Sequence, residues 1–190
     1  KTEVIPWFPQ NPELPEYSAD AAEPFDALET DPRLENLTRT LLGDGWNTLY
    51  SMVMFSRKGT TGQAWHQDCP PEDAAKFNMN RLVYTRDLSD DIGGQTVVMP
   101  GSHKLGVLPA GDPHQDLEGQ VVLRPRKGTL VLLHGHCWHR VLPIKGAYRF
   151  STNYRVCPAG TPNDITDICV YRNMRYRFST SSVIEERQAE

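Results

Sequence analysis

The chain has 190 residues, of which 38% are hydrophobic, a net charge of −4 and a pI near 5.9. This length suits one domain with a sizeable core, and the negative charge argues against a nucleic-acid partner. No apolar run approaches membrane-spanning length and no signal-peptide pattern opens the chain, so we expect no membrane partner and a cytoplasmic location. The four cysteines form no C-x-x-C pair, which favours reduced, buried thiols over a zinc knuckle or a disulfide framework.

The first third of the chain is expected to hold an extended arm and then a helix. Residues 1–33 contain six prolines and little periodicity, so they are predicted to form an arm that wraps the domain. Asp31 can cap the helix that follows, Pro32 suits its first turn, and Gly43 should end it. Three leucines at helical spacing are predicted to form its apolar stripe: Leu34, Leu37 and Leu41.

Strands dominate the chain from residue 46 onward. Short runs rich in β-branched and aromatic residues are separated by turn signals such as SDDIGG and PRKG. Such a series predicts a β-sandwich or a β-barrel, with most of the helix preceding it. The expected strands are WNTLYSMVMFS, NRLVYTRDL, GQTVVM, GQVVLRP, GTLVLLH and AYRFSTNYRV.

Two side chains that bind metals well lie two positions apart in the segment GQAWHQDCPP, namely His66 and Asp68. On an extended chain, residues i and i+2 point to the same side, so both could bind one ion. The pair alone is a weak motif, because an ordinary strand end can also carry a His and an Asp. A second histidine cluster, LLHGHCWHR, follows about seventy residues later and offers a third ligand.

The strand after this cluster alternates between polar and aromatic residues. One face holds Arg149, Ser151, Asn153 and Arg155, and the other holds Tyr148, Phe150, Thr152 and Tyr154. The polar face could lie in water, as in any half-buried strand, with Arg149 in a salt bridge at the rim. It could also line a cavity that needs an arginine. The strand by itself leaves both interpretations open.

Four segments, in their order and spacing, resemble the phytanoyl-CoA dioxygenase family: WHQD, GGQTVVMPGSHK, GTLVLLHGHCWHR and RFSTNYRV. The resemblance covers roughly residues 34–160. It implies a mainly β fold with flanking helices, built around a double-stranded β-helix (a jelly-roll, cupin-like core). We therefore expect one dioxygenase domain over residues 1–190, with a catalytic core at about 34–160 and a C-terminal extension at 161–190.

The family consists of iron(II)- and 2-oxoglutarate-dependent oxygenases, so the resemblance implies these two cofactors together with O2. The expected reaction hydroxylates or otherwise oxidises a small organic substrate, with succinate and CO2 as co-products. By this resemblance His66, Asp68 and His139 are the metal ligands and catalytic residues. Arg149 and Ser151 would bind the distal carboxylate of 2-oxoglutarate. Related halogenases carry a small residue at the position of Asp68, so hydroxylation is favoured over halogenation.

The third ligand has rivals in His134 and His136. His139 stands ten residues before Arg149, which is similar to the family's interval between ligand and arginine, and Gly135 allows a bend ahead of it. One alternative function is a cupin-like metalloenzyme that binds metal through His134 and His136 and uses no 2-oxoglutarate. Another is a jelly-roll binding protein without catalysis.

Overall fold

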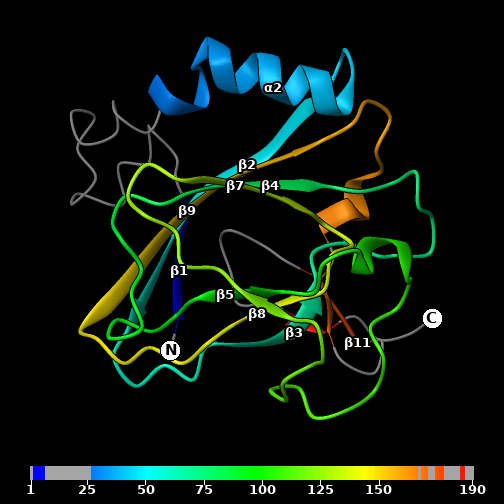
Figure 1. The fold of residues 1–190 in the computed structure, drawn as a ribbon. Coiled ribbons are helices and arrows are strands. Elements are labelled where there is room, and N and C mark those ends of the chain that lie inside the picture. Colours follow the sequence, from blue (N-terminus) through cyan, green and yellow to red (C-terminus); the bar gives the residue numbers. More distant parts are fainter. Residues whose placement is uncertain (1, 7–26, 167, 171–173, 178–184, 187–190) are drawn as a thin grey trace.

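The computed structural model describes residues 2–6, 27–166, 168–170, 174–177 and 185–186. Its ribbon shows helix α2 above a stack of β-sheets (Figure 1). The elements are β1 (Thr2–Pro6), α2 (Pro32–Leu42), β2 (Asn47–Arg57), β3 (Gln63–Gln67), β4 (Met79–Val83), β5 (Thr96–Val98), the 3-10 helix η1 (Ser102–Lys104), β6 (Val121–Val122), β7 (Leu130–His134), β8 (His139–Val141), β9 (Tyr148–Cys157), η2 (Asn163–Thr166), β10 (Ile168–Val170), β11 (Met174–Arg177) and β12 (Glu185–Glu186).

The strands form two antiparallel sheets. One sheet has the order β1-β2-β9-β4-β7, and the other has the order β12-β11-β10-β3-β8-β5-β6. From β2 to β5 the chain changes sheet at every step, and it does so again from β6 through β9. This pattern confirms the expected fold class, a mainly β jelly roll with little helix. In the described part of the chain, no helix is long and apolar enough to cross a membrane.

The ends of α2 match the sequence prediction. The Asp31 side chain accepts a hydrogen bond from the Arg33 backbone N–H at 2.8 Å, and a proline occupies the first turn. Gly43 has a φ of 82°, and its N–H donates to the Arg39 carbonyl at 2.9 Å. A left-handed φ favours glycine, so this residue ends the helix as expected.

The predicted leucine stripe of α2 is wrong in two of its three members. Leu34 is buried, but Leu37 and Leu41 are 37% and 50% exposed. Thr38 is fully buried instead, and its hydroxyl accepts a hydrogen bond from Arg81 Nη1 of β4 at 3.0 Å. Position 38 of the helix faces Arg81, which points outward from the sheet. A hydroxyl at this position can accept from the guanidinium, and a leucine could not.

Six of the described strands were absent from the predicted series: β1, β3, β8, β10, β11 and β12. β1 pairs with β2, so residues 2–6 of the expected arm belong to a sheet. β3 and β8 carry the two candidate histidine ligands and pair with each other. Beyond residue 160, β10 pairs with β3, with Cys169 opposite Gln67. Residues 7–26 of the arm, and the side chains of the arginines in the tail, lie outside the described residues.

The apolar core is divided, and the space between the sheets is polar. One buried cluster contains Trp65, Val97, Leu108 and Trp138, and another contains Leu82, Tyr84 and Leu88. Side chains that bridge the two sheets are polar: Asn80 of β4 bonds Asp68, and Tyr84 bonds Thr96 of β5. The described cysteines Cys69, Cys137 and Cys157 are buried free thiols, as expected.

Candidate metal centre

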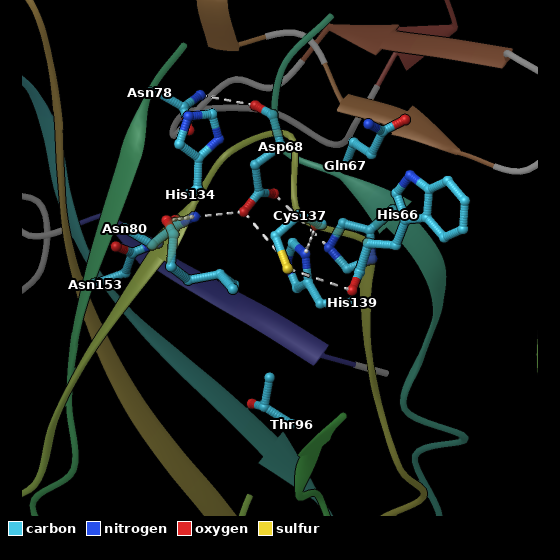
Figure 2. A network of polar contacts seen from close by, with 12 residues as sticks. His66, Gln67, Asp68, Asn78, Asn80, Thr96, His134, Cys137, His139 and Asn153 are labelled. Carbon is cyan, nitrogen blue, oxygen red and sulfur yellow. Dashed lines mark hydrogen bonds and ion pairs between the residues drawn. The ribbon is translucent and has the colours of Figure 1, made fainter. Parts of the chain in front are cut away.

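His66, Asp68 and His139 converge at one point between the sheets (Figure 2). One potential ligand atom from each residue lies within 4.8 Å of the other two. His66 Nε2 is 3.7 Å from Asp68 Oδ1, and His139 Nε2 is 3.3 Å from Asp68 Oδ2. Among the described residues this is the only group of three or more ligand-type side chains that could hold a metal ion.

Strand pairing brings the three side chains together. β3 and β8 run antiparallel, with His66 directly opposite His139 and their ring centroids 4.1 Å apart. Asp68 stands two residues beyond His66, just past the end of β3, and therefore points to the same side. The geometry thus joins the His-X-Asp pair to one histidine of the distant cluster.

Each histidine has one nitrogen committed to its own backbone. His66 Nδ1 lies 2.8 Å from the Ala64 carbonyl, and His139 Nδ1 lies 2.9 Å from the Cys137 carbonyl. A carbonyl can only accept, so Nδ1 carries the proton and Nε2 keeps its lone pair for the centre. Burial, and then the neighbouring His139, lower the pKa of His66 to about 4. His66 is therefore neutral at physiological pH, the form that binds a metal.

Asp68 is anchored by two donors from the first sheet. Asn80 Nδ2 donates to Asp68 Oδ2 at 2.7 Å, and Arg155 Nη2 donates to the same oxygen at 2.9 Å. Burial alone would raise the pKa of this carboxyl, but the Arg155 guanidinium and His139 hold it well below its ordinary value. Asp68 is consequently a carboxylate, and Figure 2 shows it directed at the two imidazoles.

Arg149 is a buried cation without a carboxylate partner in the part of the chain that the structure describes. It is 2% exposed, its Nη1 donates to Ser151 Oγ at 3.0 Å, and its Nε has no hydrogen-bond partner. Burial lowers its pKa, and nearby Tyr84 offsets only part of that effect. A buried cation needs a counter-charge. An entering carboxylate would supply one and would use the orphaned Nε–H.

Glycine 94 makes room for this arginine. Gly94 has a φ of +69°, and a Cβ there would stand 2.5 Å from Arg149 Cδ and 2.4 Å from Ile144 Cδ1. Both contacts are too short for real atoms, so the packing around the guanidinium requires glycine at this position. The polar face of β9 therefore lines the interior, and the interpretation of Arg149 as a rim salt bridge is wrong.

His134 and His136 stay outside the cluster. His134 ends β7 in one sheet, whereas His139 begins β8 in the other, and the chain crosses between the sheets from 135 to 138. His134 Nδ1 accepts the His136 backbone N–H at 3.1 Å, and His136 Nε2 lies 2.9 Å from the Pro70 carbonyl. Both rings thus have partners elsewhere, and neither belongs to the His66-Asp68-His139 group.

Two residues shape the segment 135–138, which crosses between the sheets. Gly135 fits where a side chain would clash, and the packing of Trp138 sets the direction in which the His139 side chain points. A Cβ on Gly135 would lie 2.5 Å from both Asn78 Oδ1 and Cys69 Sγ. After this turn Trp138 packs into an apolar cluster with Trp65, so the next residue, His139, points to the opposite face. Asn80, Tyr84 and Gly94 were not predicted as site residues, since a single polar residue or glycine in a strand carries no distinctive signal.

Comparisons with known proteins agree with this architecture. A model of the phytanoyl-CoA dioxygenase (PhyH) family matches residues 10–148. The dioxygenase hkm4 of Aspergillus hancockii is 30% identical over 105 residues, which are 52% of this chain and 33% of that protein. The chain therefore spans about a third of the length of this curated relative.

Solved structures share the fold at low identity. HygX from Streptomyces hygroscopicus, with nickel and 2-oxoglutarate bound, matches with a TM-score of 0.63 at 17% identity, over 84% of this chain and 70% of that chain. The epimerase SnoN, in complex with Fe3+, alpha ketoglutarate and nogalamycin RO, matches with a TM-score of 0.61 at 20% identity, over 85% of this chain and 66% of that chain.

Proposed function

The chain belongs to the phytanoyl-CoA dioxygenase family, and from this premise we propose that it is an iron(II)- and 2-oxoglutarate-dependent oxygenase that hydroxylates a small organic molecule. The observation that carries the proposal is the presence of a buried His-Asp-His cluster together with a buried arginine, Arg149, that has no carboxylate partner among the described residues. A metal site alone would fit many enzymes. The second feature points to a cosubstrate with a carboxylate at its far end.

In this proposal His66, Asp68 and His139 hold iron(II) as a facial set of two imidazoles and one carboxylate. Iron, 2-oxoglutarate and O2 together supply the oxidising power: 2-oxoglutarate loses CO2 and becomes succinate, one oxygen atom enters succinate and the other enters the substrate. The residues of the chain bind and orient the reactants. Arg149 and Ser151 bind the distal carboxylate, and the surrounding sheets keep bulk water from the centre.

Hydroxylation is the favoured outcome because Asp68 provides a carboxylate ligand. A halogenating enzyme needs a ligand position for chloride, and this carboxylate takes that position. The test is the mass of the product after turnover with chloride in excess. The proposal predicts a mass gain of one oxygen atom, and a chlorinated product from the unmodified protein would contradict it.

A small or medium-sized natural product is the favoured substrate class. HygX has been crystallised with hygromycin B and SnoN with nogalamycin RO, and both share the fold of this chain. A metabolite screen that follows succinate formation above the uncoupled background would identify candidates. A substrate of this class should stimulate succinate release and consume O2 in equal amount.

The choice of the third ligand is tested by three single variants assayed for Fe(II) affinity under nitrogen. His139→Ala should lose most iron binding, because its Nε2 faces the other two ligand groups. His134→Ala and His136→Ala should keep it, because their rings have partners elsewhere. Loss of iron in His136→Ala with retention in His139→Ala would replace this assignment with the cupin-like alternative.

A further inference from the structure

We propose that Arg155 is a positioning residue that holds one oxygen of Asp68, so that Asp68 binds iron through its other oxygen alone. This inference rests on the proposed function, because it concerns the metal site assigned there. Arg155 Nη2 donates to Asp68 Oδ2 and its Nε donates to Asn80 Oδ1, so its hydrogen bonds reach the centre through the carboxylate ligand.

The two oxygens of Asp68 have different surroundings. Oδ2 accepts hydrogen bonds from Arg155 Nη2 at 2.9 Å and from Asn80 Nδ2 at 2.7 Å, and it also lies 3.3 Å from His139 Nε2. Oδ1 faces the His66 ring, with Nε2 3.7 Å away. A carboxylate oxygen has two lone pairs in its plane. The two donors therefore engage both lone pairs of Oδ2, so Oδ1 is the better electron-pair donor to a metal although Oδ2 lies nearer to a ligand imidazole.

Arg155 and Asn153 together set the orientation of the Asn80 amide. Asn80 Oδ1 accepts from Arg155 Nε at 2.8 Å and from Asn153 Nδ2 at 2.6 Å. With its oxygen bound to two donors, the Asn80 amide must turn its NH2 group toward Asp68. One guanidinium thus donates to Asp68 directly through Nη2 and orients the second donor through Nε. A lysine has no such fork and cannot do both.

The two buried arginines of β9 have separate tasks. Arg149 and Arg155 are 2% and 3% exposed and share the inner face of the strand. Six residues of extended chain separate their Cα atoms by about 20 Å. Arg155 is already paired with Asp68, whereas Arg149 has no carboxylate among the described residues. The inner face of β9 therefore serves the metal ligand at one end and the cosubstrate at the other.

Single-oxygen binding matters for the proposed reaction. Iron held by two histidines and one carboxylate oxygen would keep open positions, which 2-oxoglutarate and O2 would need. If Asp68 bound through both oxygens, it would occupy one of them. Arg155 prevents this by keeping Oδ2 in a charge-assisted hydrogen bond.

The experiment compares Arg155→Met with the wild type after loading with Co(II), whose visible absorption weakens as its coordination number rises. Release of Oδ2 should weaken this absorption when 2-oxoglutarate is absent. It should also raise the half-saturation concentration of 2-oxoglutarate by about 10- to 100-fold, measured by the same spectrum. Arg155→Lys should give intermediate values, because it restores one contact only. Asn80→Ala should move both readouts in the same direction but less, and serves if Arg155→Met does not fold.

Arg81→Met is the matched control. Arg81 is fully buried in the same sheet, but it donates to the Tyr154 carbonyl and to Thr38 on the outer face. Its loss should lower thermal stability and leave the Co(II) spectrum unchanged. If Arg155→Met behaves like this control, Arg155 is a structural residue and the inference is wrong. If the wild type binds no Co(II) or Fe(II) at all, the proposed function fails first, and the two failures are distinct.

Discussion

Arg149→Ala tests the cosubstrate site, and the structure sets the size of the effect. The arginine is 2% exposed and has an Nε–H without a partner, so a bound carboxylate gains a desolvated, charge-assisted contact. Truncating one partner of such a pair costs about 2–5 kcal/mol. The half-saturation concentration of 2-oxoglutarate should therefore rise by about 30-fold to several thousand-fold.

The assay is an anaerobic titration of the iron-loaded protein, followed by the visible charge-transfer band of the complex. Ser151→Ala is the control: it removes a neutral hydroxyl that accepts from Arg149 Nη1, worth about 0.5–1.5 kcal/mol, or about 2- to 13-fold. The iron-free Arg149→Ala protein should be at least as stable as the wild type, because an uncompensated buried cation is removed. A half-saturation concentration within twofold of the wild type would refute the assignment of Arg149.

Two further variants test the packing around the site. Gly94→Ala should weaken 2-oxoglutarate binding, because its Cβ would press on Arg149. Gly101→Ala is the control: Gly101 has a similar φ of +81°, but a Cβ there would meet no atom within 4 Å, so only stability should change. Equal 2-oxoglutarate affinities in the two variants would contradict the clash. Thr38→Val removes the buried acceptor of Arg81 and should lower the free energy of unfolding by about 1–3 kcal/mol in urea without changing cosubstrate affinity. An unchanged urea midpoint would mean that the helix contact contributes nothing.

Local signals in the sequence were sufficient for several features. The ends of α2 were predictable because capping by Asp31 and termination by Gly43 depend on neighbouring residues only. The alternation along β9 was predictable for the same reason, and it placed Arg149, Ser151 and Arg155 on one face, as observed. Only the structure shows that this face is interior, because that depends on what packs against it.

Other features depend on partners that are distant in sequence. β3 and β8 are short, with five and three residues, so the direct pairing of His66 with His139 carries no local signature. The role of Arg155 becomes visible only when β9 is placed next to β4, where Asn80 and Asp68 meet it. Likewise, Leu37 and Leu41 fit an apolar stripe by spacing, but the sheet below α2 presents a guanidinium to Thr38.

The most direct test of the account is one spectrum. Fe(II) and then 2-oxoglutarate are added to the wild-type protein under nitrogen, and the visible region is recorded before and after the second addition. The account predicts a weak metal-to-ligand charge-transfer band that appears only when both are present, because iron at the His-Asp-His cluster and a cosubstrate held by Arg149 must lie side by side. If iron binds and no band appears at saturating 2-oxoglutarate, the chain has a metal site of another kind and the proposed oxygenase function is wrong.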